Sequence, residues 1–135
     1  MCVSFGAVNL VEEIRAGGTQ IYNNVLYVVR DLHIDGLTLS LTELKPFKST
    51  RGHSHDDIDE IYVFVCGSGY MQLGVDDIKE TFAVGKGKVV LVRKGVFHRV
   101  MNESIVPLEF VSIFAKKRNN IHYQYAKQES VAACV

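Results

Sequence analysis

Three histidines and one glutamate have the side chains from which transition-metal sites are usually built. His53 and His55 stand two positions apart, Glu60 follows after a short polar stretch, and His98 lies much further along the chain. Imidazole and carboxylate groups are the side chains that divalent transition metals recruit at neutral pH. We expect these four residues to form one mononuclear metal site. The ligand types leave Fe, Mn, Ni and Zn open as the metal.

The local pattern indicates how these side chains reach one another. Side chains two apart on an extended strand point to the same face, so His53 and His55 share a face. The polar connection 56–59 turns the chain before Glu60, and His98 must come from a separate strand. A lone histidine is more often a structural or exposed residue than a ligand, so the joint spacing is what favours a metal.

The rest of the chain reads as many short strands. Asp35-Gly36 is a hairpin signal between two β-prone runs, Val28–Ile34 and Leu37–Leu44. In the second run, leucines alternate with threonine and serine, which is typical of a half-polar strand. Further β-prone runs are separated by turns rich in Gly and Asp: Glu60–Cys66, Tyr70–Val75, Ile78–Val84, Val89–Val92, Phe97–Met101 and Leu108–Ala115. These runs predict an all-β barrel or sandwich. Ala7–Arg15 shows no clear period and fits either a strand or one helical turn.

Composition narrows the function classes. The 135 residues contain 15 basic and 15 acidic side chains, a balance that disfavours nucleic-acid binding. Apolar runs fall short of the roughly 20 residues that span a membrane, and the N-terminus lacks the features of a secretory signal. The three cysteines match neither a zinc pattern nor a disulfide framework, and we expect Cys66 in the core. We expect a reduced, cytoplasmic protein without nucleic-acid or membrane partners.

We expect residues 1–135 to form a single domain with a core at about 25–115, on which N-terminal strands and the C-terminal tail pack. The strand Glu60–Cys66 adds an expectation about partners. Its alternate positions Glu60, Tyr62, Phe64 and Cys66 would face the interior, which turns Ile61, Val63 and Val65 outward. Such an apolar row needs cover from the N-terminal strands or from another subunit, and we predict a homodimer.

Two motifs resemble those of the cupins. His53-x-His55-x4-Glu60-x6-Gly67 fits the first cupin motif, and Gly87 followed by Gly95-x2-His98-x3-Asn102 fits most of the second. Phe47 and Arg93 stand where the family usually has Gly and Pro. The resemblance implies a double-stranded β-helix, the jelly-roll barrel, with a metal in its mouth. It also implies that the ligands are His53, His55, Glu60 and His98.

A narrower resemblance concerns the cupin-type phosphoglucose isomerases. It rests on Thr50-Arg51-Gly52-His53-x-His55 and on Glu60-Ile61-Tyr62, although the span from His55 to Glu60 is shorter here. It implies that Thr50 and Gly52 help to seat a phosphate, and Arg51 could attract the same group as a forked donor. It also implies that Glu60 lies near the reacting carbons of a sugar, with Tyr62 and His122 lining the pocket.

The predicted function is a metal-dependent isomerase or epimerase of a sugar or sugar phosphate. Such a reaction needs a base that moves a proton between adjacent carbons and an electrophile that stabilises an enediolate. A metal with open coordination positions supplies the electrophile, and Glu60 or a histidine supplies the base. Two alternatives stay open: a metal-dependent oxygenase of the cupin type, and a non-catalytic cupin that binds a small molecule.

Overall fold

The computed structural model describes residues 9–115, which form one short helix and a set of β-strands. The helix α1 spans Leu10–Gly17, and its first turn is capped by the side chain of Asn9, which accepts a hydrogen bond from the backbone of Glu12 at 3.0 Å. The strands are β1 (Thr19–Asn23), β2 (Tyr27–Ile34), β3 (Leu37–Leu44), β4 (Glu60–Cys66), β5 (Ser68–Val75), β6 (Ile78–Gly85), β7 (Val89–Val92), β8 (Phe97–Met101) and β9 (Leu108–Ala115).

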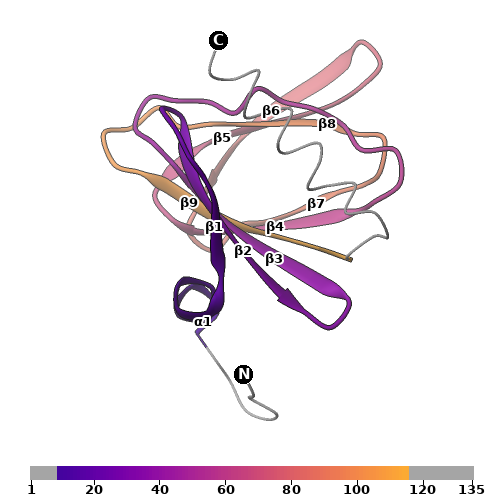
Figure 1. Cartoon of the computed structure of the whole chain (residues 1–135). Helices are drawn as coiled ribbons and strands as arrows, with labels where there is room; N and C mark the ends of the chain where they lie inside the picture. The colour runs from indigo at the N-terminus through magenta and orange to yellow at the C-terminus, as the bar shows by residue number, and fades with distance from the viewer. Residues whose placement is uncertain (1–8, 116–135) are drawn as a thin grey trace.

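The strands form two antiparallel sheets that face each other. One sheet has the order β1-β2-β3-β9-β4-β7, and the other has the order β6-β5-β8. In Figure 1 the strands β5, β6 and β8 lie above β9, β4 and β7, and α1 lies below the crossing of β1 with β9. Non-consecutive neighbours such as β3 and β9 show that the chain crosses between the sheets, as expected for a jelly roll. The predicted all-β double-stranded β-helix is confirmed.

The space between the sheets is filled by large apolar side chains at one end. The phenyl rings of Phe64 and Phe110 lie 5.3 Å apart, and the ring of Tyr62 stacks on Phe110 at 5.3 Å. Other fully buried members of this core come from both sheets: Leu44, Met71, Val100 and Leu108. Burial of this many apolar side chains is the main stabilising contribution to the barrel.

The strand β3 turns Leu39 and Leu41 outward and its hydroxyls inward, whereas Leu44 at its end belongs to the core between the sheets. Ser40 and Thr42 are buried, and both line a cavity inside the barrel. Leu41 packs on the other face of the sheet, in a second cluster with Ile14 of α1 and Val111 of β9. The helix therefore covers part of the outer face of the six-stranded sheet. The alternation in this strand was predicted from the sequence, but its direction was not.

Three sequence-based expectations need correction or completion. The segment of undecided structure near residue 10 is the helix α1, and Val65 of β4 packs against the apolar cluster that Ile14 of this helix forms with Leu41 and Val111. Cys66 is exposed and not in the core, because the pairing of β4 with β9 shifts register between Phe64 and Cys66. Glu60, Tyr62 and Phe64 do face inward as predicted.

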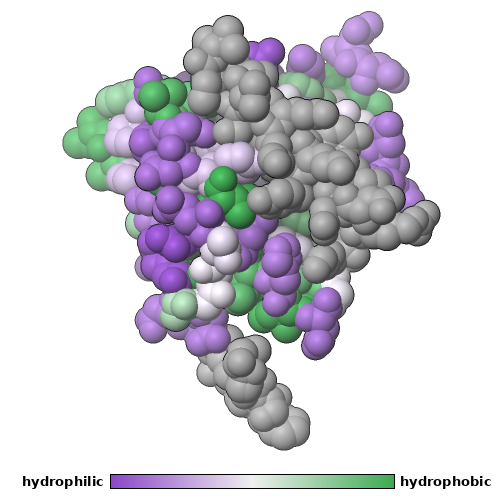
Figure 2. Space-filling view, viewed as in Figure 1, coloured by the Kyte–Doolittle hydropathy of each residue, from purple (hydrophilic) through white to green (hydrophobic). Residues whose placement is uncertain are grey.

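The surface shows both hydrophilic and hydrophobic areas. On the face in Figure 2, hydrophilic residues extend over β1–β3, and a hydrophobic patch at the upper left covers the connection between β8 and β9. Ile105 and Val106 of that connection are exposed. Within residues 9–115, no helix is long and apolar enough to cross a membrane.

Candidate metal centre

Backbone pairing fixes His53 against His98. The N–H of His53 donates to the carbonyl of His98 at 3.1 Å, and the N–H of His98 donates back to the carbonyl of His53 at 2.9 Å. This antiparallel bridge attaches the connection 45–59, which is not itself a regular strand, to β8. Thr50 continues the same pairing, because its N–H donates to the carbonyl of Val100 at 2.9 Å. The two histidines are thus positioned by main-chain bonds.

Gly52 is required for the approach to this bridge. Its φ is +93°, in the left-handed region that disfavours side chains, and a Cβ here would lie 2.6 Å from the ring of Phe97. The chain therefore passes close over β8 only because position 52 has no side chain. The Gly-His-x-His order in the sequence follows from this geometry.

Asp59 attaches the turn before β8 to the segment that leads into β4. Its carboxylate accepts a hydrogen bond from the N–H of Lys94 at 2.8 Å and one from the Nε of Arg93 at 3.4 Å. The bond from the Lys94 backbone, with the nearby Arg93 guanidinium, lowers the pKa of Asp59 below its usual value. The N–H of Gly95 in the same turn donates to the carbonyl of His55. These bonds hold the second histidine beside the first.

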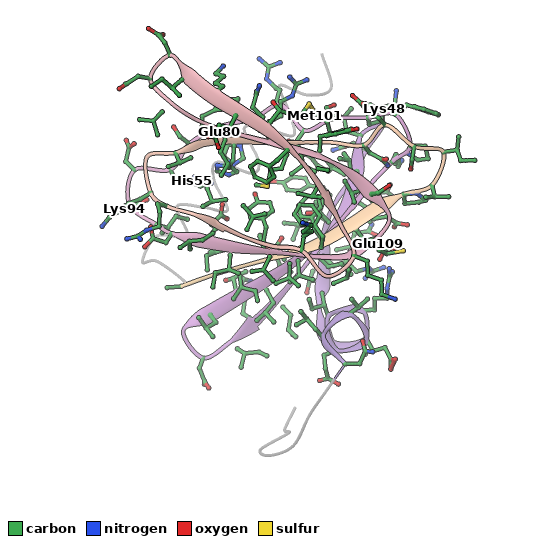
Figure 3. All side chains as sticks on the ribbon, turned by 180° about the vertical axis from the view of Figure 1, so that it is seen from behind. Lys48, His55, Glu80, Lys94, Met101 and Glu109 are labelled. Carbon is green, nitrogen blue, oxygen red and sulfur yellow. The ribbon has the colours of Figure 1, made fainter. Side chains whose placement is uncertain are left out.

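The three imidazoles converge inside the barrel. The ring centroid of His53 lies 4.5 Å from that of His55 and 4.6 Å from that of His98. The ring centroids of His55 and His98 are 5.3 Å apart. One ligand atom from each ring lies within 4.8 Å of the others. In Figure 3 the side chain of His55 points between the two sheets, whereas Lys48 and Lys94 point away from the barrel.

The carboxylate of Glu60 lies against two of the three rings. Its Oε1 is 3.3 Å from Nε2 of His98 and 3.6 Å from Nε2 of His55. With metal–ligand bonds of about 2.1 Å, neighbouring donors around one ion lie about 3.0–3.4 Å apart, so this spacing is close to that of a shared shell. Glu60 is only 1% exposed. A carboxylate buried this deeply is stabilised by a positive charge nearby, which a divalent cation would supply.

The ring of His98 is oriented as a metal ligand. Its Nδ1 lies 3.0 Å from the carbonyl oxygen of Val96. A carbonyl only accepts, so Nδ1 is the donor and Nε2 of the neutral ring carries the lone pair. That Nε2 faces Glu60 and the other histidines. In metal-binding histidines, the ring nitrogen that does not bind the metal usually donates a hydrogen bond of this kind. The three imidazoles together with Glu60 fit a divalent transition metal.

A cavity opens from this cluster into the barrel. Together with the open solvent at its mouth, it holds about 630 Å³ of empty space. His53 and His98 lie at its wall, and the rest of the lining comes mainly from β2, β3 and β9: Ile21, Tyr22, Tyr27, Val29, Asp31, Ser40, Thr42, Thr50, Tyr62, Val100, Phe110 and Ser112. Because His53 and His98 lie in its wall, a small molecule that enters this cavity has access to the metal ligands.

Some of the residues that were predicted to contact the substrate line the cavity, and others do not. Thr50 lines the cavity, and its Oγ1 accepts a hydrogen bond from the N–H of Val100 at 3.0 Å. Arg51 is exposed, and Gly52 forms the close turn over Phe97. Tyr62 lines the cavity with its ring 5.7 Å from that of His98. His122 lies outside the described residues.

The sequence analysis missed the far wall of the cavity. Asp31, Ser40 and Ser112 are buried there, and none of them belongs to a recognised motif. The available signal was the inward alternation of polar residues in β3 and a single aspartate within the β-prone run of β2. A polar residue at an inward position of a barrel strand is unusual unless the interior holds a ligand or a polar network.

Comparison with known families decides which family the chain belongs to. The family model described as "Cupin domain" matches residues 40–114, more than half of the chain. The chain belongs to the cupin family. The matched region runs from β3 to β9 and includes all three histidines and Glu60. The cupin resemblance expected from the two motifs is therefore confirmed.

Individual proteins that are similar to this cupin are much longer than it. A vicilin-like seed storage protein of Arabidopsis thaliana is 30% identical over 92 residues, which cover 67% of this chain and 19% of the relative. Oxalate decarboxylase from Bacillus subtilis superposes with a TM-score of 0.64 at 22% identity, over 69% of this chain and 26% of that one.

A third similar structure comes from another kind of protein. The capsular polysaccharide assembling protein CapF from Staphylococcus aureus superposes with a TM-score of 0.66 at 17% identity, over 74% of this chain and 28% of that one. At these identities the structures support the fold alone. The chain thus spans less than a third of the length of each of these three relatives.

Proposed function

We propose that this cupin is a metal-dependent isomerase or epimerase of a small sugar or sugar phosphate. The observation that supports this proposal most directly is the convergence of His53, His55, His98 and Glu60 beside a cavity with hydroxyl-bearing walls. The metal would be Fe, Mn, Ni or Zn, held by the three imidazoles and by Glu60.

The proposed reaction moves one proton between adjacent carbons. A bound divalent metal supplies Lewis acidity that stabilises negative charge on the substrate oxygens. Glu60 accepts the proton from the carbon that carries the hydroxyl and returns it to the former carbonyl carbon. The hydroxyl proton moves in the same direction, from the hydroxyl oxygen to the former carbonyl oxygen. Atoms and electrons balance within the substrate, so the reaction needs no oxidant or reductant.

Two further residues take supporting roles in this proposal. Tyr62 stacks on Phe110 and lies edge-on to His98, so its ring orients a substrate at the metal. A role for His122 at the substrate is implied by the resemblance to cupin-type isomerases alone, since this residue lies outside the described part of the chain. For a phosphorylated substrate, Thr50, Arg51 and Gly52 would contact the phosphate at the rim of the cavity.

The test measures the incorporation of solvent deuterium at a carbon atom of the substrate. Metal-loaded protein is incubated in D₂O with a panel of aldoses, ketoses and their phosphates, and products are read by NMR. Interconversion with deuterium at the carbon next to the carbonyl supports the proposal. Glu60→Gln should abolish exchange, while Glu80→Gln, a matched change on β6, should leave it unaltered. Metal content is measured on both variants, so that loss of the ion is separated from loss of the base.

The same samples distinguish the alternative functions. Oxygen consumption without deuterium exchange would replace the isomerase proposal with the oxygenase alternative. Saturable stabilisation by a ligand, with neither exchange nor oxygen uptake, would favour a non-catalytic binder.

A further inference from the structure

Two serines lie side by side on the wall of the cavity. The strand register pairs Ser40 of β3 with Ser112 of β9, and Ser112 in turn with Tyr62 of β4. Both serines are 5% exposed, and both line the cavity. Thr42, two residues after Ser40 on the same face of β3, is also buried and lines the cavity. We refer to Ser40, Thr42 and Ser112 as the hydroxyl cluster.

The hydroxyl cluster differs from two other threonines of the barrel, which use their hydroxyls within the protein. Oγ1 of Thr38 lies 2.9 Å from Nδ1 of His33, and Oγ1 of Thr50 accepts from the N–H of Val100 at 3.0 Å. Within residues 9–115, no side-chain hydrogen bond of this kind involves the hydroxyl cluster. Buried polar groups in native proteins nearly always have a hydrogen-bond partner. Partners for these hydroxyls therefore come from what enters the cavity.

The cluster lies within reach of a ligand at the metal centre. Residues directly opposite on neighbouring strands have Cβ atoms about 4.5–5.5 Å apart, so Ser112 is next to Tyr62, whose ring lies 5.7 Å from that of His98. Much of the remaining lining is apolar or aromatic, including Val100 and Phe110. A few fixed polar groups in such a pocket orient a ligand. A sugar combines hydroxyls with apolar C–H groups, which suits both parts of this wall.

We propose that Ser40 and Ser112 are specificity-determining residues that bind the hydroxyls of a sugar whose carbonyl end lies at the histidines. This inference rests on the proposed function for the class of ligand and for its position at the metal. Each serine hydroxyl both donates and accepts, so it pairs with a sugar hydroxyl in either sense. A ligand without hydroxyls remote from its carbonyl leaves both serines unpaired and is selected against.

Isothermal titration of the Mn²⁺-loaded protein compares sugars with a fragment that lacks the remote hydroxyls. The sugars are D-fructose, D-ribose, fructose 6-phosphate and ribose 5-phosphate. The fragment is hydroxyacetone, which has only the carbonyl and the neighbouring hydroxyl. We expect the tightest-binding sugar to bind the wild type at least about tenfold more tightly than hydroxyacetone does. Sugars that bind no more tightly than hydroxyacetone, or that do not bind at all, would overturn the inference.

Variants of the two serines locate the effect. We expect Ser112→Ala and Ser40→Ala each to weaken binding of the tightest-binding sugar about three- to tenfold and to leave hydroxyacetone binding unchanged. Ser68→Ala, the same change at an exposed position of β5, is the matched control and should bind as the wild type does. Thermal melting and Mn²⁺ uptake check that each variant is folded and loaded. An equal loss of sugar and hydroxyacetone binding would assign the serines to support of the metal centre and overturn the inference.

The outcomes separate this inference from the proposed function. Sugar binding that depends on Ser40 and Ser112, without any isomerisation, supports the role of the two serines and counts against the isomerase. Isomerisation of a sugar with unchanged kcat and KM in both alanine variants supports the isomerase and overturns the role of the serines. Sugar binding that is equal in the wild type and in both variants also overturns it.

Discussion

His53 and His98 exchange two backbone hydrogen bonds, so two of the three imidazoles at the candidate metal centre are fixed in position by the main chain. The N···O distances of these bonds are 3.1 Å and 2.9 Å. The third histidine, His55, follows two residues after the bridge, and its own carbonyl accepts from Gly95 in the turn before β8. Ligands held in this way lose little conformational freedom when they bind an ion.

Gly52 is expected to be essential for this arrangement. Gly52→Ala places a Cβ against the ring of Phe97 and into a backbone conformation that L side chains rarely adopt. We expect it to lower the free energy of unfolding by about 1–3 kcal/mol and to weaken metal binding. Chemical denaturation and metal titration measure the two effects. Gly36→Ala is the control, because a Cβ there has no atom within 4 Å; equal behaviour of the two variants would contradict the role of Gly52.

Asn102 is expected to stabilise the barrel rather than to take part in chemistry. Its buried Nδ2 donates to the carbonyls of Leu44, Lys45 and Val106 at 2.9–3.2 Å, and its Oδ1 accepts from the N–H of Ser104. Asn102→Ala leaves these groups without the amide, and we expect a loss of at least about 2 kcal/mol in the free energy of unfolding. Thermal and urea denaturation measure it. Unchanged stability would show that the connection between β8 and β9 does not depend on this amide.

The outer face of the six-stranded sheet leads us to expect a homodimer. Ile61 of β4 pairs with Leu91 of β7, and both are exposed, as is Val89. Burial of such a row against a second copy removes apolar surface from water. Light scattering at micromolar concentration should show a dimer, and Leu91→Lys should shift it towards monomer. Ile105→Lys, at an exposed apolar position between β8 and β9, is the control; a monomeric wild type would refute the prediction.

Much of the fold could be predicted because short-range patterns determine it. The strands β3, β4, β7, β8 and β9 begin and end where alternation and turn residues place them. The departure at Phe47 has a visible physical reason. Its φ is +61°, the left-handed conformation that explains why the family usually has Gly at this position. Phe47 keeps this conformation with an exposed side chain.

The cavity wall could not be predicted in the same way. An alternating strand such as β3 specifies two faces but not which of them points inward. Here the leucine face packs under α1, whose residues gave no clear period in the sequence. The grouping of Asp31 with Ser40 and Ser112 depends on pairing between β2, β3 and β9, and β9 is distant in the chain. The four candidate metal ligands could be predicted from the sequence because they follow a recognised motif spacing.

Metal analysis of tag-free protein tests the central claim most directly. After loading and removal of excess ion, the wild type should retain close to one transition-metal ion per chain, and a variant with both His53→Ala and His98→Ala should retain none while its far-ultraviolet circular dichroism still shows a β-protein. The same treatment of His33→Ala, whose ring contacts the hydroxyl of Thr38 at 2.9 Å, should leave the metal content unchanged. A wild type that takes up no metal on titration, or a double variant that binds as much as the wild type, would contradict the account.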